Sequence, residues 1–293
     1  MQIDIPLVRR LLESQFPRLS RLAVRPVESA GWDNVIYRLG TDLAVRLPRR
    51  RIGADHTENE HRWLPQLAAQ LPLPVPVPVG KGGPGEGYPW YWTVCPWLPG
   101  EVAAIAPVAD MNQVAMSLAQ FVHAMQSIDP AGGPVSKFRG GTLAARDPVS
   151  QASAAALRHS LDVGPVLEVW EAAVAEPAWT RPPVWMHGDL HPANLLVSNE
   201  ELTGVIDFGL LGVGDPACDL MVAWTYLSGD ARRVFRNAMG VDDSTWARGR
   251  GWALHLGLAA AVSADNPLLG TIGLNTIAEI MAEFPRSRAS ASG

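Results

Sequence analysis

The sequence contains very few cysteines and almost no lysine. Cys95 and Cys218 are the only cysteines among its 293 residues. Two cysteines are too few for a disulfide framework or a four-cysteine zinc site, and their scarcity predicts a reducing compartment. Of the 24 basic residues, only Lys81 and Lys137 are lysines. Any cation that the chain needs for its function is therefore expected to be an arginine.

A long apolar run and a net positive charge are also missing. The longest apolar run, around residues 252–264, contains His255 and is shorter than the roughly 18 residues that a membrane-spanning helix needs. The first four residues lack the charged and apolar regions of a signal peptide. The net charge of −5 argues against a nucleic-acid binder, which needs clustered Lys and Arg. These absences predict a cytoplasmic protein that binds neither membrane nor nucleic acid.

The composition is that of an ordinary globular protein, with 47% apolar and 18% charged residues. The length suggests two domains or one domain with two lobes. Residues 5–16 carry apolar side chains at helical spacing, whereas residues 22–47 contain three short alternating runs separated by turn-like segments. This pattern predicts a helix followed by an antiparallel meander.

The segments up to residue 100 continue this small β-rich part. Residues 56–70 predict a helix, with Thr57 as a possible N-cap and Pro65 as the site of a kink or a late start. Alternating prolines over 71–80 favour an extended connector, and residues 81–87 form a Gly-rich turn. Residues 90–94 then predict a strand that is broken at Cys95.

Helices are expected to dominate the rest of the chain. They are predicted over 108–127, most of 149–175 and from 217 onward, with breaks at Gly240, Asn266-Pro267 and Gly270. The resulting fold class is α+β with two lobes. A small antiparallel sheet lobe would cover residues 1–96 and a larger, mainly helical lobe residues 97–293. A ligand is expected in the cleft between them.

The most informative stretch runs from residue 184 to residue 219. His187 and Asp189 precede Asn194 with the spacing H-x-D-x-x-x-x-N of the kinase catalytic loop, and Asp207-Phe-Gly follows a predicted strand over 202–206. Phosphoryl transfer needs Mg²⁺ held by oxygen ligands, which Asn194 and Asp207 supply. Asp189 is suited to orient an acceptor hydroxyl and to take its proton.

Two other interpretations of this stretch remain open at this point. His187, Asp189 and His191 alternate along the chain and could be the metal ligands of a hydrolase. They could also lie in an ordinary surface loop. Neither interpretation explains Asn194 and Asp207, and in the kinase-like interpretation His187 braces the loop by hydrogen bonds, as does Asp219.

Several segments resemble the aminoglycoside phosphotransferase family. Residues 187–196, 206–209 and 214–220 match the family patterns HGDLHPxNLL, IDFG and GDPxxDL, while residues 31–34 and 43–49 resemble its nucleotide loop and third strand. The resemblance covers nearly the whole chain. It implies a protein-kinase-like fold and transfer of the γ-phosphoryl of ATP or GTP to a hydroxyl of a small molecule, often an aminoglycoside or macrolide antibiotic.

The nucleotide side departs from the kinase pattern. Protein kinases place a lysine on the third strand to hold the α and β phosphates, but Arg46 stands at that position here. Neither Lys81 nor Lys137 is expected on a strand where it could replace Arg46. Arginine is permanently charged and can donate to two phosphate oxygens. Its expected helix partner is Glu60, with Glu58 as the rival.

The other predicted nucleotide contacts come from a loop and from the connector between the lobes. The loop contains only Gly31, and Ser29 and Asn34 could donate to phosphate oxygens, although a plain hairpin turn explains these residues nearly as well. The resemblance implies that the connector presents backbone groups to the nucleobase. Cys95 and Trp97 are therefore predicted to contact the nucleotide.

The acceptor is left open by the sequence. A polycationic aminoglycoside would favour a pocket lined by carboxylates. The candidates are Asp162, Glu168, Glu171, Asp230, Asp242 and Asp243. Residues 246–274 contain mostly Trp, Leu, Ala and Gly, which suits a bulkier and less charged acceptor equally well. A metabolic kinase for a sugar, a choline-like amine or an amino alcohol, and a catalytically weak nucleotide-binding protein, are the alternatives.

Overall fold

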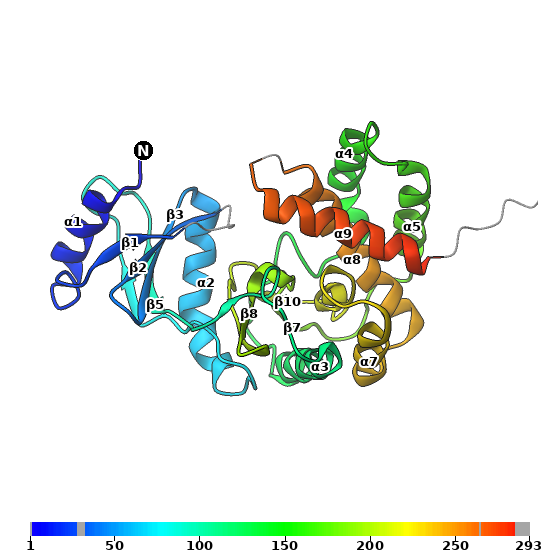
Figure 1. The fold of residues 1–293 in the computed structure, drawn as a ribbon, viewed down its shortest axis with the longest axis horizontal. Coiled ribbons are helices and arrows are strands. Elements are labelled where there is room, and N and C mark those ends of the chain that lie inside the picture. Colours follow the sequence, from blue (N-terminus) through cyan, green and yellow to red (C-terminus); the bar gives the residue numbers. More distant parts are fainter. Residues whose placement is uncertain (1, 28–32, 264, 285–293) are drawn as a thin grey trace, which may run out of the picture.

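A computed structural model describes residues 2–27, 33–263 and 265–284. It confirms the two-lobed α+β class, with a β-sheet and two helices at one end and a larger, mainly helical assembly at the other (Figure 1). We call these the sheet lobe, which contains α1, α2 and β1–β5, and the helical lobe, which begins at β6. No helix in the described parts of the chain is long and apolar enough to cross a membrane.

The sheet lobe is built on one antiparallel sheet with the strand order β1-β2-β3-β5-β4. Its strands are β1 (Val24–Pro26), β2 (Asn34–Leu39), β3 (Leu43–Pro48), β4 (Gly80–Gly82) and β5 (Trp92–Pro96). Because side chains alternate between the faces of a strand, Val45 and Leu47 of β3 join the buried core with α1 (Ile5–Gln15), whereas Arg46 lies on the opposite face. That face is covered by α2 (Arg51–Ala68), so Arg46 lies between sheet and helix.

Helix α2 differs from the sequence prediction at its start. It begins at Arg51 rather than near residue 56, and Thr57 lies inside it, where its hydroxyl donates to the Gly53 carbonyl at 3.0 Å. Thr57 is therefore not an N-cap. Pro65 is also inside the helix, and it removes one donor without ending α2, because Leu64 and Leu67 pack into the core of the helical lobe.

Three smaller predictions are corrected as well. Strand β5 continues through Cys95 and Pro96, because its pairing with β3 extends to Leu43. Lys81 lies on a strand after all, β4 at the sheet edge. Gly270 does not break a helix but lies within α9 (Pro267–Glu283), whose packing against α8 outweighs the cost of about 1 kcal/mol for an internal glycine.

The helical lobe surrounds its own core of large apolar side chains, including Phe121, Trp170, Trp185, Trp224 and Trp252. Its main helices are α3 (Met111–Ser127), α4 (Asp147–Leu157), α5 (Val163–Ala175), α6 (Val222–Thr225), α7 (Gly229–Met239), α8 (Asp243–Ala261) and α9. Short 3₁₀ turns are η1 (Leu143–Arg146), η2 (Pro192–Asn194) and η3 (Cys218–Met221). Helix α8 is buried along most of its length between α4, α5, η3 and α9, so it forms the centre of this lobe.

Two small antiparallel sheets hold the segments that contain the predicted site residues of the helical lobe. One pairs β7 (Val184–Met186) with β10 (Gly212–Gly214), and the other has the order β6-β8-β9. The latter consists of β6 (Glu101–Val102), β8 (Leu195–Ser198) and β9 (Glu201–Val205). We call residues 187–194, between β7 and β8, the catalytic loop, after the kinase loop whose residue spacing they share. The Ile206 amide donates to the Asn194 carbonyl at 2.9 Å, which brings Asp207 next to the end of this loop.

Candidate active site

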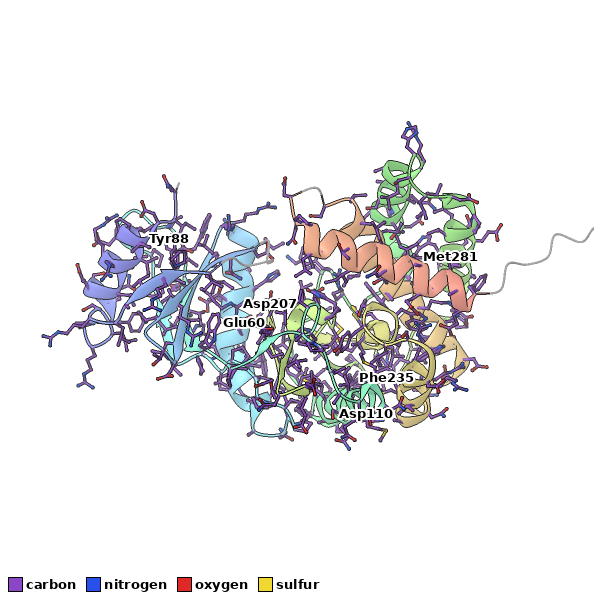
Figure 2. The ribbon with its side chains drawn as sticks, in the orientation of Figure 1. Glu60, Tyr88, Asp110, Asp207, Phe235 and Met281 are labelled. Carbon is purple, nitrogen blue, oxygen red and sulfur yellow. The ribbon has the colours of Figure 1, made fainter. Side chains whose placement is uncertain are left out.

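Arg46 lies at the junction of the two lobes and contacts two carboxylates. Its Nη1 donates to Oε2 and Oε1 of Glu60 at 2.8 and 3.1 Å, and its Nη2 donates to Oδ1 of Asp207 at 3.1 Å. Glu60 and Asp207 lie close together between α2 and the helical lobe (Figure 2). Burial by itself lowers the pKa of Arg46, but the two carboxylates outweigh burial and raise it, so the guanidinium remains charged.

Glu58, the alternative predicted partner of Arg46, contacts Lys81 instead. Its Oε2 accepts from the Lys81 ammonium at 2.6 Å on the half-exposed edge of the sheet lobe. The ammonium also lies 4.4 Å from the centre of the Tyr91 ring. Lys81 is therefore engaged away from Arg46, although it sits on a strand, and it does not replace Arg46.

Hydrogen bonds from Asp219 and His187 hold the backbone of the catalytic loop in place. The buried Asp219 carboxylate accepts from the backbone amides of His187 at 2.7 Å and Gly188 at 2.8 Å. His187 Nδ1 accepts from the Asp189 amide at 3.2 Å, and Nε2 donates to the Ile206 carbonyl at 3.0 Å. Gly188 has a φ of +83°, and a Cβ there would lie 2.8 Å from a backbone oxygen, so the turn requires glycine.

Asp189 is surrounded by donors. Its Oδ1 lies 3.3 Å from Nη2 of Arg139, and its Oδ2 lies 3.3 Å from Nε2 of His191. The Asn194 amide nitrogen donates to the Asp189 carbonyl at 2.9 Å and to Oδ2 at 3.3 Å. Burial alone raises the pKa of Asp189, but His191 and Arg139 outweigh it and hold that pKa well below its usual range. The carboxylate is thus ionised and oriented before any substrate binds.

These contacts argue against a hydrolytic metal site formed by the two histidines and Asp189. Both ring nitrogens of His187 are used in hydrogen bonds, one to the Asp189 amide and one to the Ile206 carbonyl, so neither is free to bind a metal. In the parts of the chain that the structure describes, no group of three or more His, Cys, Asp and Glu side chains gathers in a way that could hold a metal ion.

The donor set of Asn194 and Asp207 does fit Mg²⁺. The Asn194 amide nitrogen is occupied by Asp189, which leaves its side-chain oxygen for another partner. The Asp207 side chain is 39% exposed and uses only Oδ1 in its contact with Arg46. Asp207 also has a φ of +62°, in the left-handed region that aspartate adopts more readily than most non-glycine residues. Mg²⁺ is commonly held by one or two such oxygen donors together with phosphates and water.

A comparison with known protein families identifies the chain. The sequence pattern described as the phosphotransferase enzyme family matches residues 24–252. This stretch covers well over half of the chain and includes Arg46, Asp189, Asn194 and Asp207. The chain belongs to the phosphotransferase enzyme family. The family resemblance seen in the sequence is thereby confirmed. Among curated proteins, no sequence matches significantly.

Solved structures of family enzymes share the fold. The GDP and kanamycin complex of APH(2″)-IIia has 22% identity and a TM-score of 0.72, covering 94% of this chain and 99% of that one. The GDP complex of aminoglycoside 2′-phosphotransferase-IIIa has 20% identity and a TM-score of 0.72, with 96% and 99% coverage. Macrolide 2′-phosphotransferase MphH from Brachybacterium faecium, an apoenzyme, has 23% identity and a TM-score of 0.61, with 97% and 99% coverage.

The remaining nucleotide contacts expected of a phosphotransferase are only partly visible. Ser29 and Gly31 lie outside the described residues. Asn34 begins β2, and its side-chain oxygen is buried without a hydrogen-bond partner among the described residues. Cys95 is 2% exposed on β5, and burial raises the pKa of its thiol to about 11, so it is neutral. The ring of Trp97 lies under the Arg38 guanidinium at 4.4 Å and borders a cavity of about 440 Å³.

Sequence reasoning missed three charged residues in or behind the candidate site. Arg139, which contacts Asp189, precedes the catalytic loop by about fifty residues. Asp215 and Arg248 form a buried, two-point ion pair, with Nε to Oδ2 at 2.7 Å and Nη2 to Oδ1 at 3.2 Å. Asp215 belongs to the GDPxxDL segment, and this was the one available signal. Arg139 lies in a Gly-rich segment and Arg248 in a Trp-rich one, and neither segment has a residue spacing typical of a functional motif.

Proposed function

We propose that the protein transfers the γ-phosphoryl group of ATP or GTP to a hydroxyl of a small antibiotic-like molecule. The observation that carries this proposal is the convergence of Asp189, Asn194 and Asp207, with Arg46 bound to Asp207 across the two lobes. Further support comes from structural relatives whose solved complexes contain GDP with kanamycin and ATP with streptomycin.

In this proposal the residues of the chain act on different parts of the reaction. Asp189 accepts a hydrogen bond from the acceptor hydroxyl and takes its proton as the new O–P bond forms. The bond between the γ phosphorus and the oxygen that bridges it to the β phosphate breaks, and the nucleoside diphosphate leaves with that oxygen. Arg46 donates to phosphate oxygens and counters their charge.

Asn194 and Asp207 would hold Mg²⁺. The ion would neutralise the charge on the β and γ phosphate oxygens. Asn194 contributes its side-chain oxygen because its amide nitrogen is committed to Asp189. Asp207 contributes its exposed carboxylate, and Arg46 keeps that carboxylate in place from the sheet lobe.

The charges on the acceptor side favour a molecule with few positive charges, such as a macrolide-like compound. Of the six acidic candidates, Asp162 and Asp242 cap helices α5 and α8, and Asp230 and Asp243 pair with arginines on α7. Glu168 and Glu171 are exposed on α5. The charged neighbour of Asp189 on this side is the cation Arg139. Among the described residues this pairing leaves no excess of negative charge beside Asp189 to attract a densely cationic acceptor.

The sheet lobe would bind the nucleotide and the helical lobe the acceptor, with the lobes divided near residue 96. The connector after β5 would then face the nucleobase, and Trp97 would border it. We further propose that the protein acts in the cytoplasm, which is consistent with two buried, unpaired cysteines.

The deciding experiment is Mg²⁺-dependent release of ADP or GDP with aminoglycosides, macrolides and small amino alcohols as acceptors, beside Asp189→Ala. Turnover with one acceptor class, lost in the variant, would support the proposal and name the substrate class. Nucleotide binding without release for every acceptor would favour the catalytically weak nucleotide-binding protein. Equal release in the wild type and in Asp189→Ala would contradict the role of Asp189.

A further inference from the structure

Arg139 connects an otherwise remote loop to the catalytic loop. Its Nε donates to the Gly188 carbonyl at 2.8 Å, and its Nη2 lies 3.3 Å from Oδ1 of Asp189. Its Nη1 donates to the carbonyl of Phe138 at 3.3 Å. The side chain is 14% exposed, and Asp189 is its acidic partner among the described residues. One guanidinium therefore holds both the backbone before Asp189 and the Asp189 carboxylate.

The loop that carries Arg139 is itself fixed on its other side. The Gly140 carbonyl accepts from the Asp215 amide at 2.8 Å, and Asp215 is held by the two-point ion pair with Arg248 of α8. The Ser136 hydroxyl oxygen accepts from the Arg139 amide at 3.1 Å. A continuous chain of contacts thus leads from the central helix α8 through Asp215 and Gly140 to Arg139.

We propose that Arg139 is a positioning residue for the transfer reaction, which fixes the Asp189 carboxylate for the acceptor hydroxyl. This inference rests on the proposed function and adds a role for a residue outside the family patterns seen in the sequence. Arginine suits the task because its planar fork donates to a carbonyl and a carboxylate at the same time. The single ammonium of a lysine could donate well to only one of these two acceptors, the Gly188 carbonyl or the Asp189 carboxylate.

Positioning and simple structural support lead to different kinetics. Arg139 makes no hydrogen bond or ion pair with Arg46, Glu60 or Asp207 in the described residues. Its loss should therefore leave nucleotide binding unchanged while the reacting carboxylate rotates away from its productive orientation. Misplacement of a reacting group by about 1 Å costs about 10²-fold in rate.

The test compares Arg139→Ala, Arg139→Lys and the control Arg146→Ala, with kcat and both KM values measured for each. Arg146 lies at the end of η1, and its side chain makes no hydrogen bond or ion pair in the part of the chain that the structure describes. We expect Arg139→Ala to lower kcat by about 10²-fold with the nucleotide KM within about twofold. Arg139→Lys should recover part of the rate. Millimolar guanidinium ion should rescue Arg139→Ala but not Asp189→Ala.

A second measurement separates this inference from the proposed function. Hydrogen exchange of the peptide over residues 186–195 should be faster in Arg139→Ala than in Arg139→Lys or Arg146→Ala, even if no acceptor is found. Unchanged exchange and kcat in Arg139→Ala would overturn the inference, as would an equal loss in Arg146→Ala. If Arg139→Ala does not fold, Arg139→Gln and Arg139→Lys serve in its place, and equal rates in these two would also overturn it.

Discussion

The two ends of the site use ion pairs in opposite ways. At the junction of the lobes a single cation, Arg46, contacts two carboxylates, Glu60 and Asp207. In the catalytic loop a single carboxylate, Asp189, contacts the cation Arg139 and a histidine. The first arrangement therefore has more carboxylates than cations, with burial raising the pKa of Glu60, whereas the second has one carboxylate for one arginine.

Under the proposed function, this difference predicts which end would rearrange when substrates bind. If the protein acts as proposed, the additional carboxylate at the lobe junction would bind a metal ion, and Arg46 would exchange partners when a nucleoside triphosphate binds. The catalytic loop instead has its carboxylate already ionised and held, so it needs no such exchange. We call these the phosphate end and the acceptor end, and the predictions below test whether their roles separate.

The largest effect is expected at the phosphate end, from Asp207→Ala. This variant removes an oxygen ligand and leaves Arg46 with Glu60 alone, so we expect loss of Mg²⁺-dependent nucleotide binding together with turnover. Isothermal titration with ADP or GDP, with and without Mg²⁺, measures the nucleotide affinity. Retained turnover would show that Asp207 is not a metal ligand.

At the acceptor end, Asp189→Ala should affect turnover alone. Loss of the proton-accepting group lowers the rate by about 10³-fold, within the range for general bases. Nucleotide affinity should stay within about twofold, because the Asp189 side chain makes no hydrogen bond or ion pair with Arg46 or Asp207 among the described residues. Single-turnover kinetics and nucleotide titration on the same samples separate the two quantities. A large loss of nucleotide affinity would mean that the ends do not act separately.

How far the sequence predicts this site depends on the distance between partners along the chain. The catalytic loop was predictable because Asp189 and Asn194 are five residues apart and the loop has a fixed spacing. Asp219 was also expected to brace the loop, and it accepts two of the loop's backbone amides. The antiparallel meander was predictable from its alternating side chains, since that period reflects local geometry.

The rest depends on contacts that no local pattern encodes. Arg139 meets Asp189 from fifty residues away, and Arg248 meets Asp215 from thirty-three residues away. The start of α2 was misplaced because Thr57 resembles an N-cap, whereas its hydroxyl is satisfied inside the helix. A side-chain hydroxyl can serve either role, and tertiary packing decides between them.

A moderate effect is expected from Arg46→Lys at the phosphate end. Lysine keeps the charge but loses the fork that holds Glu60 and Asp207 together, and one charge-assisted hydrogen bond contributes about 1.5–3 kcal/mol. We therefore expect kcat/KM for the nucleotide to fall by about 10- to 100-fold, mainly through KM. Steady-state kinetics with varied nucleotide measures this. An equal or higher kcat/KM would mean that the geometry of arginine is not needed here.

The last comparison is between two glutamates of α2, and it tests whether the buried charges at the phosphate end also stabilise the sheet lobe. Glu60→Gln leaves Arg46 with a single carboxylate in a buried site, and breaking a buried pair costs about 3 kcal/mol or more. Glu58→Gln removes an exposed contact with Lys81, and such pairs contribute less than about 1 kcal/mol. Urea unfolding of both variants measures the difference. Similar unfolding midpoints would mean that Asp207 alone compensates Arg46, so that Glu60 orients the guanidinium for the phosphates without stabilising the sheet lobe.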